Sequence, residues 1–198
     1  PKWTLIIHLA GLLYFPEEQV AYQEADLREV CSEMGLRLTQ TVAGEEGLDA
    51  TLLDLILHPW MVLKKAHFKG SFHPVTFYTP LGRVSEFEEA IFALAQKHGY
   101  PLSDIGEYLL VVERGRYGYC EFDFHGDLDD PDDVERVRNL WLEANEVCAN
   151  MGALLAKPYG PCAEMIYRRV DPAYVATIKS LKREFDPNNI LNPGKLCF

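Results

Sequence analysis

The sequence predicts an α+β fold in which helices cover one face of a mostly antiparallel sheet. Stretches with period-two alternation and stretches with a helical period follow one another along the chain, and two of the alternating stretches are close enough to form a hairpin. The elements occur in the order β-α-β, a helical connector, then β-α-β-β-α and a late short strand. This order favours a ferredoxin-like α+β sandwich with two loosely duplicated β-α-β halves.

We expect the first half to occupy residues 1–70. Its elements are a strand at 3–9, a helix from Pro16 to Met34, a strand at 36–42 and a helix at 48–57. Proline suits the first turn of a helix, and Gly35 can adopt the left-handed conformation that ends one. The segment 60–69 matches neither period and stays ambiguous.

The second half, residues 71–198, has the stronger periodicity. Its elements are a strand at 72–79, a helix at 84–98, strands at 105–113 and 116–125, a helix from Pro131 to Met151, a strand at 153–155 and helices at 163–168 and 172–185. Arg114 and Gly115 form the expected hairpin turn. Asp130 precedes Pro131 and is expected to cap that helix through its carboxylate. Together the halves form one expected domain over residues 1–198.

The net charge and the spacing of the cysteines limit the classes of binding partner and the cellular compartment that we expect. Lysine and arginine number 19 and aspartate and glutamate 30, a formal charge of −11, so neither nucleic acid nor an anionic membrane surface is expected. Five widely spaced cysteines suggest neither a disulfide framework nor a thiolate zinc site. The apolar run at 5–15 is too short to span a bilayer. We predict a soluble, cytoplasmic protein.

The expected strand at 116–125 carries the strongest candidate site. Tyr119, Glu121, Asp123 and His125 alternate with apolar residues, so all four side chains leave the same face. A solvated outer face explains this alternation by itself. Alternatively, the face lines a substrate cavity in which the carboxylates and the imidazole move protons.

A metal-assisted hydrolase built on the carboxylates and imidazole of that strand is a further hypothesis. Three ligands on one strand rarely complete a coordination shell, so we expect no metal site. The sequence also contains no G-x-G-x-x-G, G-x-x-x-x-G-K-[ST], G-x-S-x-G or H-E-x-x-H motif. It therefore carries no recognisable dinucleotide, nucleoside triphosphate or hydrolase site of its own.

Tyrosine and arginine are concentrated after residue 100. They are Tyr108, Tyr117, Tyr119, Tyr159, Tyr167 and Tyr174, with Arg114, Arg116, Arg168 and Arg169 among them. Packing with bonded hydroxyls explains most such residues. The functional alternative is that some of them hold an anionic oxygen of a substrate through charge-assisted hydrogen bonds.

The tail carries a family resemblance. Residues 185–195 are F-D-P-N-N-I-L-N-P-G-K. This run closely resembles the C-terminal signature F-D-P-x-x-[IL]-[LM]-N-P-G-K of FAD-linked oxidases of the vanillyl-alcohol oxidase, p-cresol methylhydroxylase and glycolate oxidase type. The order of elements from Pro131 onward also follows the C-terminal domain of that family. The resemblance covers most of the chain, and it is strongest from about residue 72.

The resemblance implies a ferredoxin-like cap domain that covers the flavin and supplies most of the substrate pocket. FAD would be bound mainly by an N-terminal FAD-binding domain or subunit that this chain lacks, so the chain alone should be inactive. Its other expected partners are a small-molecule substrate and further copies in an oligomer. An isolated cap should also expose an apolar or tyrosine-lined patch.

The implied reaction is oxidation of an alcohol-type or para-substituted phenolic substrate by hydride transfer to flavin. Where glycolate oxidase relatives have a G-E-H-G loop, this chain has K-P-Y-G at 157–160. That difference favours the branch that holds a phenolate with tyrosine and arginine. The alternatives are the cap of a 2-hydroxy acid dehydrogenase and a non-catalytic ferredoxin-like ligand-binding module.

Several residues are the expected site residues under this resemblance. We expect His125, Glu121 and Tyr159 in catalysis, Lys157, Tyr167, Arg168 and Tyr119 in substrate binding, and Asn192 and Lys195 in cofactor binding.

Overall fold

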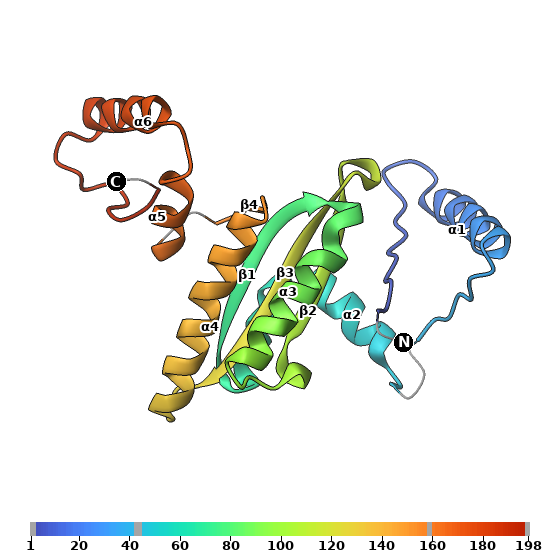
Figure 1. The fold of residues 1–198 in the computed structure, drawn as a ribbon. Helices are drawn as coiled ribbons and strands as arrows, with labels where there is room; N and C mark the ends of the chain where they lie inside the picture. Colours follow the sequence, from blue (N-terminus) through green and yellow to red (C-terminus); the bar gives the residue numbers. More distant parts are fainter. Residues whose placement is uncertain (1–2, 42–44, 158–159, 197–198) are drawn as a thin grey trace. The chain divides into compact units, whose positions relative to one another are not determined.

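The computed structural model describes residues 3–41, 45–157 and 160–196. The chain divides into an N-terminal unit, Pro1–Val62, and a C-terminal unit, Leu63–Phe198 (Figure 1). Among the described residues, no helix combines the length and the apolar character needed to cross a membrane.

The N-terminal unit contains helices joined by irregular segments, such as residues 3–15 and 36–41. It contains α1 (Pro16–Glu33) and α2 (Leu48–Leu57), and the 3-10 helix η1 (Pro59–His67) continues into the C-terminal unit. The strands expected at 3–9 and 36–42 were wrong, since no strand occurs over residues 3–41. An apolar run indicates that a segment can be buried, but a strand also needs a neighbouring strand to pair with, and the run does not indicate whether one exists.

The C-terminal unit contains a four-stranded antiparallel sheet in the order β2-β3-β1-β4. Its strands are β1 (Gly70–Pro80), β2 (Gly106–Val112), β3 (Tyr117–Asp127) and β4 (Leu154–Leu155). Helix α3 (Val84–Lys97) connects β1 to β2, and α4 (Pro131–Asn150) connects β3 to β4. The result is the split β-α-β arrangement of a ferredoxin-like fold.

The predicted α+β class is therefore confirmed, but the duplicated halves lie elsewhere. The two β-α-β units are β1-α3-β2 and β3-α4-β4, and both fall within the C-terminal unit. The halves expected at residues 1–70 and 71–198 do not correspond to them. The connection at η4 (Glu113–Gly115) joins β2 to β3 and contains the predicted turn residues, with positive φ at Arg114 and Gly115.

Helices α3 and α4 cover one face of the sheet (Figure 1), as predicted. The core between these helices and the sheet is dominated by large apolar side chains, namely Val75, Phe77, Phe87, Ile91, Phe122, Phe124, Val137 and Leu140. The carboxylate of Asp130 accepts from the backbone N–H groups of Asp132 and Asp133 and so caps α4 as expected.

Beyond β4 lie α5 (Pro161–Tyr167), α6 (Pro172–Phe185) and a tail. Asp186, the aspartate of the tail signature, is buried and organises the turn that follows. Its carboxylate accepts from the N–H groups of Ile190 and Leu191 at 2.9 Å each and pairs with Lys182. The remaining 3-10 helices are η2 (Leu81–Arg83) and η3 (Leu102–Asp104).

Candidate functional site

The face of the sheet that α3 and α4 leave uncovered, here called the open face, carries the predicted polar side chains of β3. The buried residues Cys120, Phe122 and Phe124 belong to the core, so the residues between them point to the opposite side. Tyr78 of β1 lies in register with Tyr119, and Tyr108 of β2 lies in register with Glu121.

Lys65 of η1 joins the two carboxylates of this face. Its Nζ donates to Glu121 Oε1 at 2.5 Å and to Asp123 Oδ2 at 2.7 Å. The Glu121 and Asp123 side chains are only 14% and 4% exposed, so both charges depend on this partner for compensation. The segment that supplies Lys65 is the one that matched neither period in the sequence.

The two carboxyls respond differently to this environment. Burial by itself raises the pKa of Glu121, but the hydrogen bond and charge of Lys65 bring that pKa below its usual value. Burial dominates at Asp123 and keeps its pKa raised. Although burial opposes it, the pKa of Lys65 is raised by the two acidic partners. Glu121 is therefore the more firmly ionised of the two carboxyls.

Tyr119 connects this charged cluster to a group of aromatic rings. Its hydroxyl donates to Glu121 Oε2 at 3.1 Å. Burial and the neighbouring negative charge of Glu121 raise the pKa of Tyr119. Its ring centroid lies 5.3 Å from that of Tyr78 and 6.4 Å from that of Tyr108. Tyr78 and Tyr108 are 38% and 48% exposed, so these three tyrosines form the exposed half of the open face.

Asp123 and His125 form the covered half of the open face. Phe68 packs against the His125 ring at a centroid distance of 5.1 Å, nearly perpendicular. Both polar residues are buried. Within the part of the chain that the structure describes, Asp123 Oδ1 and His125 Nδ1 have no hydrogen-bond partner. His125, a predicted catalytic residue, thus lies beneath Phe68.

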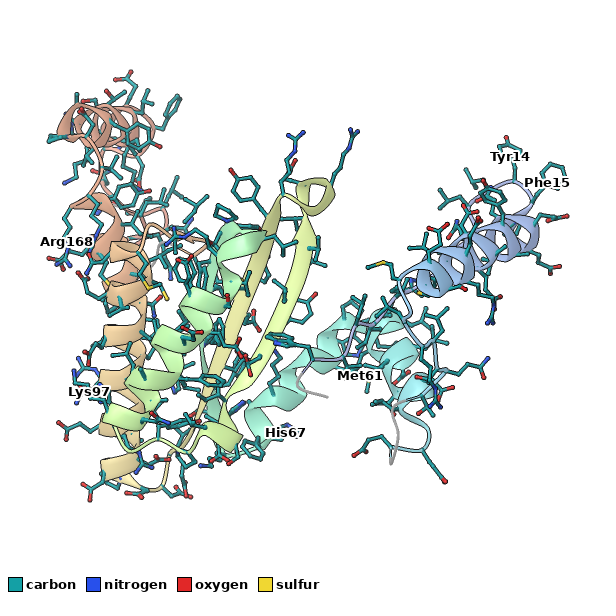
Figure 2. All side chains as sticks on the ribbon, turned by 45° about the vertical axis from the view of Figure 1, so that its right-hand side comes forward. Tyr14, Phe15, Met61, His67, Lys97 and Arg168 are labelled. Carbon is teal, nitrogen blue, oxygen red and sulfur yellow. The ribbon has the colours of Figure 1, made fainter. Side chains whose placement is uncertain are left out.

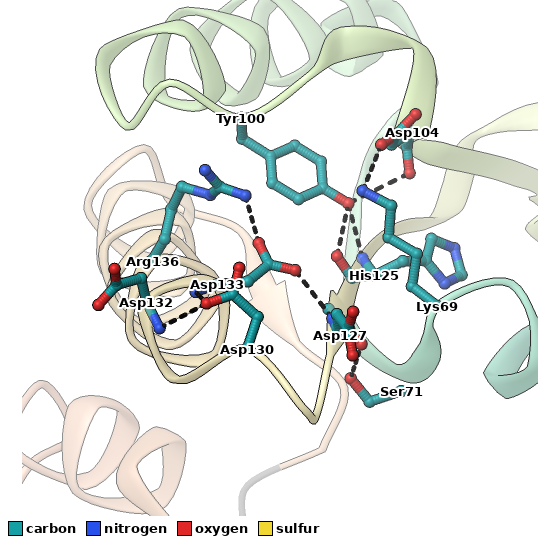
Figure 3. A network of polar contacts seen from close by, with 11 residues as sticks. Lys69, Ser71, Tyr100, Asp104, His125, Asp127, Asp130, Asp132, Asp133 and Arg136 are labelled. Atoms are coloured by element: carbon teal, nitrogen blue, oxygen red, sulfur yellow. Dashed lines mark hydrogen bonds and ion pairs between the residues drawn. The ribbon is translucent and has the colours of Figure 1, made fainter.

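A network of polar contacts holds the end of β3 below His125 (Figure 3). The Tyr100 hydroxyl accepts from the His125 N–H at 2.7 Å and donates to the His125 carbonyl at 3.0 Å. Lys69 pairs with Asp104 at 2.6 Å, beside Tyr100. Asp133 accepts from the Asp127 N–H at 2.8 Å. The backbone of the covered half is therefore fixed on several sides.

A metal-assisted hydrolase would need a set of metal ligands, and residues 3–41, 45–157 and 160–196 contain no such set. No group of three or more histidine, cysteine, aspartate or glutamate side chains is placed there to hold a metal ion. Glu121 and Asp123 instead direct an oxygen each to Lys65.

The other predicted site residues are distributed differently. Lys157 is exposed, and its charge contributes to lowering the pKa of Glu121, after the larger effects of burial, Lys65 and Tyr119. Tyr167 and Arg168 line a separate cavity of about 390 Å³ between α5, α6 and the tail. Arg168 also pairs with Glu146 of α4. Tyr159 lies outside the described residues.

The predicted cofactor residues lie in the tail turn. Asn192 has a φ of 49°, in the left-handed region where asparagine is one of the tolerated side chains, and its carbonyl accepts from the Lys195 N–H at 3.3 Å. These contacts give Asn192 a conformational role.

Sequence reasoning missed Lys65 and the place of Tyr78 beside Tyr119. Two carboxylates on one face of a half-buried strand need a nearby cation to compensate their charge, so a basic partner could have been predicted from the sequence. It does not indicate which lysine supplies the charge, because Lys65 is 56 residues from Glu121 along the chain.

Comparisons with known proteins agree with the resemblance carried by the tail. The chain is similar to glycolate oxidase subunit GlcD of Bacillus subtilis (strain 168), with 33% identity over 76 residues. That match covers 35% of this chain and 16% of the subunit. The family described as FAD linked oxidases, C-terminal domain, matches residues 79–196, which include the whole of α3, β2, β3 and α4. This chain belongs to that family of FAD-linked oxidase C-terminal domains.

Proposed function

We propose that the chain is the substrate-binding cap of an FAD-dependent oxidoreductase that oxidises an alcohol-type or para-substituted phenolic substrate. The observation that carries this proposal is the exposed half of the open face. There, three tyrosine rings surround a carboxylate that is held ionised by Lys65. Aromatic side chains give a flat apolar wall, and the carboxylate gives a polar point that can orient a hydroxyl group.

The side chains of the open face fit one side of the flavin ring of FAD, and they do not fit the pyrophosphate of FAD. Exposed tyrosine rings suit contact with a planar ring system, whereas Glu121 and Asp123 would repel phosphate groups. We therefore propose that a companion FAD-binding domain or subunit holds most of the cofactor, with Asn192 and Lys195 of the tail as its contacts in this chain. Bound FAD would supply the hydride acceptor for the oxidation.

Each site residue has a proposed role in this arrangement. Tyr119 and Glu121 would orient the substrate hydroxyl, and its proton would pass to the Tyr119 oxygen as the Tyr119 proton moves to the Glu121 carboxylate. His125, in the covered half of the open face, would make the surroundings of the substrate more polar. Tyr159 would act in catalysis. Lys157, with Tyr167 at the end of α5 and Arg168 directly after it, would contact more distant parts of the substrate.

Exposed apolar side chains support a companion partner. In the N-terminal unit, Leu13 is 95% exposed, and Tyr14 and Phe15 lie at the N-terminal end of α1 (Figure 2). Such a surface is typical of a contact region for another domain or another copy of the chain. We propose that residues 1–198 act as one cap in an oligomeric flavoprotein and that this chain alone is inactive.

The cysteines support a reducing location. Cys31, Cys120, Cys148 and Cys162 are buried and carry free thiols. Burial raises the pKa of Cys120 to about 11 and that of Cys148 to about 12, so these thiols are inert at neutral pH. We propose a cytoplasmic location on this basis.

The test is flavin reduction in the complete flavoprotein, with its FAD-binding domain, in the absence of oxygen. We expect benzyl-type alcohols or para-alkylphenols to bleach the flavin absorbance. Bleaching by glycolate or lactate alone would instead support a 2-hydroxy acid dehydrogenase, the alternative that the similarity to the glycolate oxidase subunit favours. A chain whose flavoprotein is reduced by neither class would contradict the proposal and favour a ligand-binding module.

A further inference from the structure

The hydroxyl of Tyr119 has its only proton engaged. A tyrosine hydroxyl carries one donor hydrogen and can accept through the oxygen. Here the donor is directed at Glu121 Oε2, at 3.1 Å. Toward the exposed half of the open face, Tyr119 therefore presents an acceptor oxygen.

Lys65 fixes the direction of the hydrogen bond between Tyr119 and Glu121, with the tyrosine as donor. It binds Glu121 Oε1 at 2.5 Å, which leaves Oε2 as the oxygen that faces Tyr119. An ionised carboxylate is an acceptor only, so it cannot return a proton to the tyrosine oxygen. The order of contacts is thus ammonium, carboxylate and phenol, and the ammonium and the phenol both donate to the carboxylate.

The charges around this acceptor are unfavourable to an anion. Glu121 and Asp123 share the single charge of Lys65. Lys157 adds a positive charge from an exposed position, where solvent and salt weaken its effect. A ligand carboxylate or phenolate placed on Tyr119 would face the Glu121 charge without a donor of its own to offer.

The neighbouring rings define the rest of the ligand. Tyr78 and Tyr108 flank Tyr119 from the strands on either side of β3, and both are exposed. Offset or edge contacts with such rings favour a flat aromatic group. The covered half of the open face is closed by Lys65 and Phe68, so the ligand lies over the tyrosines.

We infer that Tyr119 and Glu121 form an acceptor site for a neutral hydroxyl group carried by an aromatic ring, and that Lys65 is the positioning residue of this site. The inference rests on the proposed function for the role of this ligand as substrate. It commits the site to donors such as aryl alcohols or un-ionised phenols and excludes recognition of an anionic oxygen at Tyr119.

Binding to the 198-residue chain, followed by nuclear magnetic resonance of ¹³C-labelled tyrosine rings, tests the inference. Three probes share a benzyl or phenyl ring and differ in the polar group: benzyl alcohol donates, benzyl methyl ether cannot donate, and benzoate is anionic. We expect benzyl alcohol to shift the resonances of Tyr78, Tyr108 and Tyr119. Its affinity should exceed those of the ether and of benzoate by about threefold or more, the value of one modest hydrogen bond.

Variants connect this preference to the named residues. Tyr119→Phe should lose most of the preference for the alcohol over the ether, because the hydroxyl oxygen is gone and Glu121 Oε2, the other oxygen of the site, lies 3.1 Å from the position that it occupied. Lys65→Met should also lose the preference, and Lys65→Arg should restore most of it, since an arginine can bridge two carboxylates. Tyr174→Phe on α6 is the matched control, because Tyr174 is exposed and lies outside the open face. It should retain the full preference.

Several results would overturn the inference. They are tighter binding of benzoate, equal binding of the ether in the original chain, shifts confined to other tyrosines, and no saturable shift up to the solubility of the alcohol. This outcome is separable from that of the proposed function. If the chain prefers benzyl alcohol but no alcohol reduces the flavoprotein, only the proposed function is contradicted. If the flavoprotein oxidises alcohols but the chain prefers benzoate, only the inference is contradicted.

Discussion

Gly106 on β2 lies opposite Asp123 on β3, so close that a Cβ at position 106 would stand 3.2 Å from Asp123 Cβ and 3.4 Å from Asp123 Oδ2. The absence of a side chain at position 106 therefore makes room for the buried carboxyl that Lys65 binds. A residue of β2 with no chemistry of its own thus determines where a charged group of the candidate site lies.

Gly106→Ala should displace Asp123 and lower the free energy of unfolding by about 1–2 kcal/mol, as expected for an added carbon at a tight contact. Urea denaturation measures this change. Gly82→Ala is the control, because a Cβ at Gly82 meets nothing within 4 Å. It should change stability by less than about 0.5 kcal/mol. Equal stability of the two variants would show that the close contact is easily relieved.

Tyr100→Phe should destabilise the C-terminal unit by about 1–3 kcal/mol, because the buried N–H of His125 loses its hydroxyl acceptor. The same denaturation experiment applies. Tyr108→Phe provides a comparison at an exposed ring and should be nearly neutral. Unfolding of Tyr100→Phe at the same urea concentration as the original chain would show that the Tyr100 hydroxyl does not stabilise the end of β3.

Asp133 should make the stability depend on pH. Burial raises its pKa, but the Asp127 N–H and Arg136 outweigh this effect and hold the pKa below its usual value of 3.8. A lowered pKa in the folded state means that the contribution is present above the unfolded pKa and is lost as the pH falls through the folded pKa. Asp133→Asn should thus be less stable than the original chain near neutral pH, and the gap should shrink toward about pH 3. A gap that does not change with pH contradicts this assignment.

Asp186→Ala should loosen the tail turn. It removes the acceptor of the Ile190 and Leu191 amides and the partner of Lys182. Hydrogen exchange at those two amides should become faster by about tenfold. Asn188→Ala, at an exposed neighbouring position, should leave the exchange unchanged. Unaltered exchange in Asp186→Ala would mean that the turn forms without its carboxylate.

The exposed apolar side chains of the N-terminal unit should cause self-association when the companion domain is missing. The mass of the chain in solution should therefore rise with concentration. Leu13→Asp should reduce this rise, because it places a charge on an almost fully exposed apolar position. A chain that stays monomeric at every concentration would count against a contact surface in this unit.

Local pattern predicted much of the C-terminal unit and little of the N-terminal one. The side of β3 on which Tyr119 and Glu121 lie follows from a period of two, and the start of α4 follows from an Asp-Pro pair. The strands expected at 3–9 and 36–42 failed, because the pattern of apolar residues does not reveal whether a pairing strand exists.

Long-range contacts limited the prediction of the site. Glu121 could be selected from its own strand, but its ion pair with Lys65 and its hydrogen bond from Tyr119 depend on how η1 and β3 meet in the fold. The tail signature identified the family, and the structure gives Asp186 within it a structural role. Tyr167 and Arg168 were selected by residue type, and they line a cavity that none of the open-face tyrosines lines.

The rate of flavin reduction by substrate in the complete flavoprotein, measured without oxygen, tests most directly whether the open face binds the substrate. We predict that Tyr119→Phe slows this step by about tenfold, a barrier increase of about 1.4 kcal/mol, while Tyr174→Phe stays within about twofold of the original rate. Flavin reduction at the original rate in a correctly folded Tyr119→Phe protein would contradict the claim that the open face holds the substrate.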